Sequence, residues 1–172
     1  MAGLLGLYFS SRASRRGKVQ AQQTGHHFLT MAGWSDWVKY LVSDGKSTCG
    51  TACGIYGPSS AQYQIYATVP DNFHPGLDFF QSIDKILKGG VAACSTITAT
   101  IPTDSGPKSF KFMILREMDG CVFGKCGSEG GFTVSKTKSL YVVSIYTKSD
   151  VQPGNCSKQN AFVQTNLMNR GQ

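Results

Sequence analysis

The fold is decided by the run SFKFMILREMDGCVFGKCGSEGGFTVSKTKSLYVVSIY, which occupies residues 109–146. Apolar and polar side chains alternate along it, and short turns such as Met118-Asp119-Gly120 interrupt the alternation. Successive side chains of a strand point to opposite faces of a sheet, so this pattern predicts antiparallel strands joined by tight turns. We expect these strands at residues 109–116, 120–124, 131–136 and 139–146.

Helical patterns flank this run on both sides. Apolar side chains at steps of three and four predict a helix over residues 34–42 and a second one between Gly76 and Gly89, and a third is expected from Pro153 onward. One side of this last helix carries Cys156, Asn160, Val163 and Leu167. Further strands are predicted at residues 52–56, 63–69 and 92–99. The fold class is therefore α+β, with a central antiparallel sheet of about six to seven strands and helices packed on its faces.

The composition is that of one domain with a modest basic excess. Of 172 residues, 41% are hydrophobic and 16% charged, which is enough for one sizeable core. The formal charge is +7, but residues 1–30 hold four basic side chains and no acidic one, which leaves 13 basic against 10 acidic, or +3, for the rest. Nucleic-acid binders usually cluster lysine and arginine more densely, so we expect no nucleic-acid partner. No apolar run approaches the ~18 residues of a membrane helix.

Residues 1–30 differ from the rest of the chain. They begin with an apolar group from Leu4 to Phe9 and continue with serine, arginine and glutamine, without the charged start of a secretory signal. Arginine and serine without acidic residues are also typical of a transit peptide, which stays an alternative. We expect a disordered N-terminal extension at residues 1–30, ahead of a second possible start at Met31, and one folded domain at residues 31–172.

The sequence shows no constellation of catalytic residues. A nucleophile needs a neighbouring base, and the one histidine beyond residue 30 is His74. Carboxylates are few and scattered. Gly45-Lys46-Ser47 resembles the end of a phosphate-binding loop, but Tyr40 stands where that loop needs a glycine. We expect a binding protein without enzymatic activity, metal or cofactor.

Six cysteines leave two interpretations open. They are Cys49, Cys53, Cys94, Cys121, Cys126 and Cys156. The absence of a CxxC pair, and the distance of the histidines from these residues in the sequence, favour reduced thiols in a cytoplasmic protein. A metal or redox protein is the alternative, which metal analysis and thiol titration would distinguish.

Several placed residues resemble the profilin family, from about Met31 to the end of the chain. The aromatic pair Trp34 and Trp37 resembles the family's first helix, and residues 66–70 with 73–75 resemble its second strand and the start of its second helix. The most specific matches, in the family's order and spacing, are residues 112–116, 124–125, 130–134, 136–137 and 153–156. The resemblance implies a monomeric protein whose N- and C-terminal helices lie together on one face of the sheet, with a further helix on the other face.

The resemblance also implies a binding site for proline-rich ligands between the first and last helices. Its residues would be Trp34, Trp37, Tyr66, Asn166 and Leu167. Flat aromatic rings suit a polyproline II helix, because this preformed ligand loses little entropy on binding and its carbonyls accept hydrogen bonds from indole and phenol groups. Two positions depart from the family: Asn166 replaces a common His or Tyr, and Gln172 stands where a Tyr can occur.

A surface for monomeric actin is the second implication of the resemblance. Its residues would be Lys111, Arg116, Lys125, Ser157, Lys158 and Phe162, the last at a position that is often charged in the family. Basic side chains opposite the carboxylates of acidic actin would speed encounter and fix the orientation of the complex.

Phosphoinositide binding is the third implication. Its residues would be Lys111, Arg116, Lys125, Lys136 and Lys138, converging on one headgroup. The predicted function is regulation of actin polymerisation in the cytoplasm, in association with the cytoskeleton, by a protein that binds actin monomers, proline-rich proteins such as filament nucleators, and phosphoinositide lipids. The alternative is a phosphoinositide-binding module with weak or lost actin binding.

Overall fold

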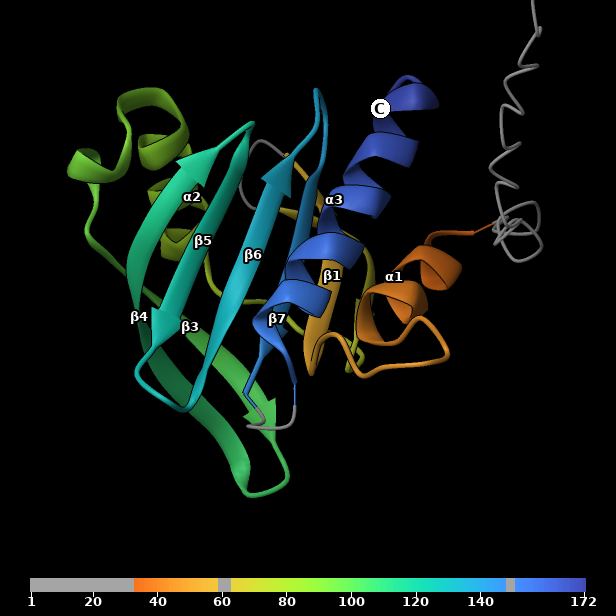
Figure 1. Cartoon of the computed structure of the whole chain (residues 1–172), viewed down its shortest axis with the longest axis horizontal. Coiled ribbons are helices and arrows are strands. Elements are labelled where there is room, and N and C mark those ends of the chain that lie inside the picture. Colours follow the sequence, from red (N-terminus) through yellow and green to blue (C-terminus); the bar gives the residue numbers. More distant parts are fainter. Residues whose placement is uncertain (1–32, 59–62, 148–150) are drawn as a thin grey trace, which may run out of the picture. The chain divides into compact units, whose positions relative to one another are not determined.

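The computed structural model describes residues 33–58, 63–147 and 151–172 (Figure 1). Expectations for residues 1–30 lie outside this part of the chain. The elements in chain order are α1 (Trp34–Val42), β1 (Ala52–Gly57), β2 (Gln64–Val69), α2 (Leu77–Gly89), the 3-10 helix η2 (Val91–Ala93), β3 (Thr96–Thr103), β4 (Gly106–Met118), β5 (Cys121–Cys126), β6 (Gly130–Lys136), β7 (Tyr141–Tyr146) and α3 (Pro153–Asn169). The α+β class is confirmed.

The described strands form one seven-stranded antiparallel sheet in the order β2-β1-β7-β6-β5-β4-β3. Strands β3 to β7 follow one another as hairpins, and the alternation and the turns of residues 109–146 predict those from β4 to β7. Strand β1, from the early part of the chain, lies beside β7, with Ala52 opposite Ile145 and Tyr56 opposite Tyr141. Strands β1, β6 and β7 are buried on both faces, so helices must cover both sides of the sheet.

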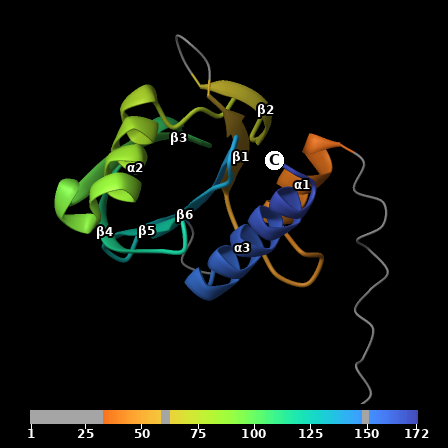
Figure 2. The same cartoon turned by 90° about the horizontal axis from the view of Figure 1, so that it is seen from above.

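The helices cover the two faces unequally, as the view from above shows (Figure 2). On one face α2 packs Phe79, Phe80 and Ile83 into the larger hydrophobic core. On the other face α1 and α3 lie side by side, and Trp37 of α1 and Leu167 of α3 share a second core with the sheet. The N- and C-terminal helices are thus packed together on one face, which confirms the predicted arrangement.

Helix α3 is fixed to the sheet by a buried polar side chain. The predicted inner side of α3, with Cys156, Asn160, Val163 and Leu167, is buried. Asn160 donates hydrogen bonds to the carbonyl oxygens of Thr133 (3.1 Å) and Val142 (3.0 Å) and to the hydroxyl of Ser144 (2.9 Å). A buried amide with several partners specifies one position of the helix, since a shifted helix would leave these groups unpaired.

The strand predicted at residues 92–99 is wrong in its first half. Residues Val91–Ala93 form the short helix η2, and β3 runs over Thr96–Thr103 instead. Gly90 has a φ of 74°, which lets the chain leave α2 through a tight turn rather than enter a strand directly. Alternating burial begins only at Ile97, and that regular alternation marks the true strand.

No helix among the described residues is long and apolar enough to cross a membrane.

Candidate ligand-binding cleft and sheet face

A cleft of about 260 Å³ lies where the first turn of α1 meets the end of α3. Its lining residues are Gly33, Trp34, Trp37, Leu167, Arg170 and Gln172. Trp34 and Trp37 are three residues apart, which places both on one side of α1. We call this the α1–α3 cleft.

An aromatic ring from the sheet extends the cleft beyond its lining residues. The ring of Tyr66, on β2, lies 5.0 Å from the ring of Trp34, with an interplanar angle of 44°. Tyr66 packs over Gly57 of the neighbouring strand β1, where a Cβ atom would stand 2.6 Å from the tyrosine ring. Tyr66 is 39% exposed and Trp34 is half-buried, so these two rings are open to a ligand.

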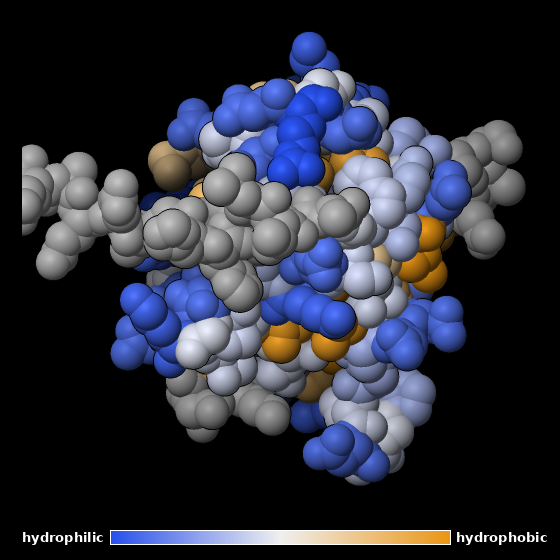
Figure 3. Space-filling view, turned by 90° about the vertical axis from the view of Figure 1, so that its right-hand side faces the viewer, coloured by the Kyte–Doolittle hydropathy of each residue, from blue (hydrophilic) through white to orange (hydrophobic). Residues whose placement is uncertain are grey.

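The other predicted residues of this site are less open. Trp37 is 4% and Leu167 is 2% exposed, so they contribute to the floor of the cleft. The guanidinium carbon of Arg170 lies 5.0 Å from the centre of the Trp37 ring. Seen from the side that carries α1, the coloured surface is mainly hydrophilic and shows only small, separate hydrophobic patches (Figure 3). The rings of Trp34 and Tyr66 are therefore the part of this site that a ligand reaches first.

The structure does not place Asn166 in the lining of the cleft. Its amide nitrogen donates to the carbonyl oxygen of Phe162 on the preceding turn, at 2.8 Å. Arg170 and Gln172 line the cleft instead, and sequence reasoning missed Arg170. The signal was its spacing of three residues from Leu167, because residues three apart share one side of a helix.

The outer side of β4 and β5 is the second candidate surface. Phe110, Phe112 and Ile114 of β4 point into the core beneath α2, so the residues between them face the opposite side. We call this surface the β4–β5 face, formed by Lys111, Met113, Leu115, Arg116, Phe123 and Lys125, all exposed except the half-buried Phe123. Its two exposed apolar side chains, Met113 (63%) and Leu115 (57%), were not predicted. An uninterrupted apolar run at residues 112–115 was the available signal.

The pairing of β4 with β5 and of β5 with β6 connects this face to α3. Met113 lies opposite Lys125, and Arg116 lies opposite Phe123 beyond an irregularity in the pairing, with its guanidinium carbon 4.5 Å from the ring centre. Phe123 lies opposite Thr133. The Thr133 hydroxyl is 3.0 Å from that of Ser157 on α3.

Four of the six predicted actin-binding residues therefore lie on this surface or at its margin. These are Lys111, Arg116, Lys125 and Ser157. Lys158 is exposed near the start of α3, and its charge acts on Cys49, which follows α1. Phe162 does not join them, because its ring packs against Tyr40 of α1 at 5.1 Å. An apolar ring gains more from this contact with α1 than from exposure to water, which explains its position.

The five predicted phosphoinositide residues do not converge. Lys111, Arg116 and Lys125 share the β4–β5 face, but Lys136 lies on the other side of the sheet and forms an ion pair of 2.6 Å with Asp84 of α2. Successive side chains of a strand point to opposite faces of the sheet. Lys136 is an even number of residues away from the core residues of β6, so it lies on the same face as they do. Lys138 lies in the turn between β6 and β7 and is exposed.

Asp84 is the centre of a polar cluster beneath α2. It accepts hydrogen bonds from Lys136, from the Tyr141 hydroxyl (2.7 Å) and from the Tyr63 hydroxyl (3.1 Å). Burial by itself would raise the pKa of Asp84, but the hydrogen bonds from Lys136 and Tyr141 outweigh it and lower the pKa below its ordinary value of 3.8. Burial, and then the neighbouring carboxylate, raise the pKa of the Tyr141 hydroxyl. These groups satisfy one another and fix α2 to the sheet.

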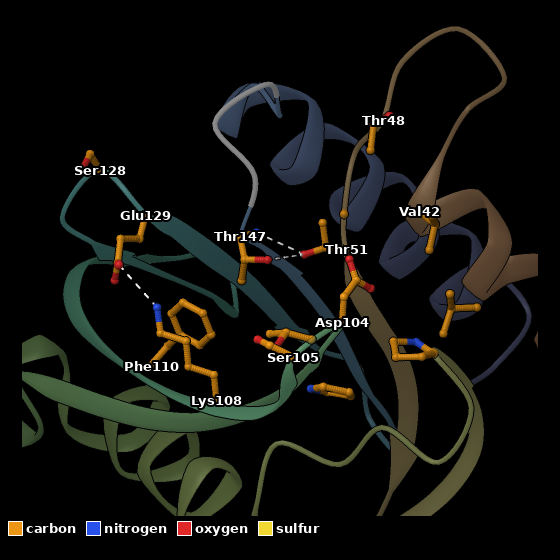
Figure 4. Close-up of a pocket in the computed structure, with 15 residues that line it drawn as sticks. Val42, Thr48, Thr51, Asp104, Ser105, Lys108, Phe110, Ser128, Glu129 and Thr147 are labelled. Carbon is orange, nitrogen blue, oxygen red and sulfur yellow. Dashed lines mark hydrogen bonds and ion pairs between the residues drawn. The ribbon is translucent and has the colours of Figure 1, made fainter.

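A second hollow, of about 840 Å³, lies between the β3–β4 turn, the β5–β6 turn and the start of β1 (Figure 4). Two pairs of its polar groups interact: the hydroxyls of Thr51 and Thr147 are 3.2 Å apart, and Lys108 forms an ion pair of 3.4 Å with Glu129. None of the predicted site residues lines this hollow.

The six cysteines, all within the described residues, are free thiols. Burial raises the pKa of Cys156 to about 12 and that of Cys121 to about 11, which disfavours the reactive thiolate. In the described part of the chain, no three histidine, cysteine or acidic side chains are grouped closely enough to hold a metal ion.

The chain is similar to profilins over nearly all of the described part. The family model for profilin matches residues 32–172. Profilin II of Acanthamoeba castellanii is 19% identical with a TM-score of 0.60, covering 81% of this chain and 100% of the other. The profilin of Schizosaccharomyces pombe is 16% identical with a TM-score of 0.61 and the same coverage. No curated protein sequence gives a significant match.

A third solved structure contains a bound ligand. Mouse profilin IIa, in complex with a double repeat from the FH1 domain of mDia1, is 19% identical with a TM-score of 0.52, covering 82% of this chain and 100% of the other. At these identities the solved structures show the fold, and the family model over residues 32–172 shows the family. With its seven-stranded sheet, its paired terminal helices and this match, the chain belongs to the profilin family.

Proposed function

We propose that this chain binds actin monomers through the β4–β5 face and the start of α3, binds proline-rich segments at the α1–α3 cleft, and so regulates actin polymerisation. Profilins are non-enzymatic binding proteins, so its effect on actin would come from binding alone. The place of action would be the cytoplasm and its actin cytoskeleton.

The observation that carries the proline-rich part is the contact between Trp34 and Tyr66. Two open rings 5.0 Å apart form a tilted aromatic surface beside the cleft. Proline rings pack well on such surfaces, and the indole N–H and the phenol hydroxyl are donors for the free carbonyls of a polyproline II helix. The FH1 repeat bound to mouse profilin IIa is a ligand of the proposed kind.

The actin part is supported by the composition of the β4–β5 face. Exposed apolar side chains at its centre, Met113 and Leu115, are flanked by Lys111, Arg116 and Lys125. Large apolar side chains that are exposed together mark protein interfaces, and a basic rim fits an acidic partner. By covering one end of the monomer, the protein would block growth at one filament end and allow delivery at the other.

The two surfaces are separated by α3. This helix packs on β6 and β7, with α1 on one side of it and the β4–β5 face on the other (Figure 1). One chain would therefore carry an actin monomer to a proline-rich filament nucleator without exchanging one partner for the other. Lys111, Arg116 and Lys125 would also meet an anionic lipid headgroup, which predicts competition between phosphoinositide vesicles and actin.

Titration with a decaproline peptide, followed by intrinsic tryptophan fluorescence, tests the proposed cleft. We expect a saturable change in fluorescence, and weaker binding of the Trp34→Ala variant by about 1–3 kcal/mol with actin affinity nearly intact, as for an aromatic hot spot. Met168→Ala is the matched control, because Met168 is an exposed apolar residue of α3 outside the cleft lining. Unchanged fluorescence in the wild type, or equal affinities for wild type and Trp34→Ala, would exclude the cleft.

A further inference from the structure

We propose that Met113 is an oxidation site, and that conversion of its thioether to a sulfoxide by a peroxide weakens the binding of actin monomers. This inference rests on the proposed actin surface and adds a way of regulating it. The described part of the chain contains three methionines, and Met113 is the most open of them: it is 63% exposed, against 49% for both Met118 and Met168. Met113 also lies at the centre of the β4–β5 face.

The strand pairing fixes the side chain of Met113 on the outer side of the sheet. Its neighbours Phe112 and Ile114 belong to the core beneath α2, and successive side chains of a strand alternate between the two faces. Met113 lies opposite Thr96 of β3 and opposite Lys125 of β5, and both of these residues are exposed. A small solute can therefore reach this side chain without any opening of the fold.

Hydrogen peroxide is the oxidant in this proposal. The thioether sulfur attacks one peroxide oxygen, an S–O bond forms as the O–O bond breaks, and the departing hydroxide takes the proton of the transferred oxygen and leaves as water. The sulfur loses two electrons, which the peroxide gains. The step needs access to the sulfur and no catalytic group of the protein. Its product, methionine sulfoxide, is polar and is returned to the thioether by methionine sulfoxide reductases.

The oxidised side chain no longer suits the proposed interface. Met113 and Leu115 form its apolar centre. An actin monomer that covers this centre would remove water from the sulfoxide oxygen, and a polar group that is buried without a donor costs free energy. Donation from the neighbouring Lys125 would satisfy the oxygen but draw that ammonium away from the carboxylates of actin, so affinity falls in either case. We expect a loss of about tenfold.

The thiols of the protein react differently and can be distinguished by experiment. Of the six cysteines, Cys94 and Cys126 are half-buried and the other four are buried. Burial, and then the charge of Glu129, raise the pKa of Cys126, which disfavours its reactive thiolate. Dithiothreitol reverses sulfenic acids and disulfides but leaves methionine sulfoxide in place. A loss of actin binding that persists after dithiothreitol, and that methionine sulfoxide reductase restores, therefore belongs to methionine.

The test uses the full chain. The protein is treated with hydrogen peroxide, then with catalase and dithiothreitol, before actin monomers are added, so that actin never meets the oxidant. Peptide mass spectrometry locates the added oxygen, and sedimentation measures the affinity for actin. We expect Met113 to be oxidised ahead of Met118 and Met168, and actin affinity to fall about tenfold as Met113 is oxidised. Decaproline affinity should not change, since Met113 lies outside the lining of the α1–α3 cleft.

Three variants assign the effect to one side chain. Met113→Leu removes the thioether and keeps an apolar side chain, so peroxide should no longer change its actin affinity. Met168→Leu is the matched control, because Met168 is an exposed methionine of α3 outside the β4–β5 face, and this variant should lose affinity on oxidation as the wild type does. Met113→Gln places a permanent polar group at the same position and should bind actin about as weakly as the oxidised protein.

The inference is overturned by an unchanged actin affinity of protein whose Met113 is fully oxidised, by an equal loss in Met113→Leu, or by oxidation of Met118 and Met168 ahead of Met113. As long as the untreated protein binds actin, these results leave the proposed actin surface standing. If the untreated wild type does not bind actin monomers, the proposed surface and its regulation by oxidation fail together.

Discussion

The ring of Tyr66 lies 5.0 Å from the ring of Trp34, although Tyr66 belongs to the edge strand β2 and Trp34 to α1. Gly57 makes this contact possible, because any side chain there would occupy the space of the tyrosine ring. The aromatic surface beside the α1–α3 cleft thus depends on helix α1, on the edge strand β2 and on a glycine of the neighbouring strand β1.

Substitution of this glycine should weaken the proposed site without touching its aromatic residues. In Gly57→Ala the new Cβ would displace the Tyr66 ring, which stands 2.6 Å away, and separate it from Trp34. We expect decaproline binding to weaken by about 1 kcal/mol, the size of an aromatic pair. Isothermal titration calorimetry measures it, with Gly154→Ala as the control because a Cβ there meets open space. Equal affinities of wild type and Gly57→Ala would show that Tyr66 takes no part.

Charge reversal on the β4–β5 face should reduce actin binding. In Arg116→Glu a carboxylate replaces the guanidinium that lies over Phe123, and it would face the acidic surface of actin. We expect a loss of at least about tenfold in affinity, since juxtaposed like charges cost several kcal/mol.

Sedimentation with actin monomers measures this loss, and circular dichroism checks the fold. Lys85→Glu is the matched control, because Lys85 is an exposed residue of α2 on the opposite face of the sheet. If both variants bind actin as the wild type does, the interface lies elsewhere.

Removal of the Asn160 amide should destabilise the fold. Asn160 is fully buried, and the two N–H groups of its amide lie within hydrogen-bond distance of three acceptors on β6 and β7. In Asn160→Ala these acceptors lose their partner, and we expect the free energy of unfolding to fall by about 2–3 kcal/mol. Urea denaturation measures the loss. Thr165→Ala, on the exposed side of α3, should change stability by less than about 0.5 kcal/mol, and a similar small effect for Asn160→Ala would contradict the role of this amide.

Asp84 should make stability depend on pH in the acidic range. Its folded-state pKa is lowered below 3.8, so its contribution is complete above the unfolded value and is lost as the pH falls through the folded value. Asp84→Asn should therefore cost about 1–2 kcal/mol at pH 6, after allowance for partial solvent exposure, and the difference from wild type should shrink below pH 3.8.

Urea unfolding at a series of pH values tests this, with the exposed Asp71→Asn as the control. A difference between wild type and Asp84→Asn that stays constant down to pH 3 would assign the loss to packing rather than to charge.

Much of the fold follows from the sequence, because its patterns are regular. The period of two in residues 109–146 predicts the hairpins, and the spacing of Val163 and Leu167 predicts the buried side of α3. The strand predicted at residues 92–99 was wrong in its first half, because a short apolar stretch after a helix can form a 3-10 turn as well as a strand.

The sites were harder to predict than the elements, because a site depends on which side chains meet across elements. The same period of two separates Lys136 from Lys111 and Lys125, although all three lie on neighbouring strands. The ring of Phe162 packs against Tyr40 of α1 and so is not part of the predicted actin surface. The spacing of Arg170 from Leu167 indicates its side of α3, but Arg170 reaches the cleft because α3 ends beside the first turn of α1, which that spacing does not show.

The most direct test of two separate binding surfaces is whether actin monomers and decaproline bind one chain together. A fluorescently labelled decaproline peptide is sedimented with the protein, with and without an excess of actin monomers kept in low salt. We expect the peptide to sediment with the larger complex of protein and actin at an unchanged affinity. Release of the peptide on addition of actin, or its failure to sediment with the protein at all, would contradict a cleft and an actin surface on opposite sides of α3.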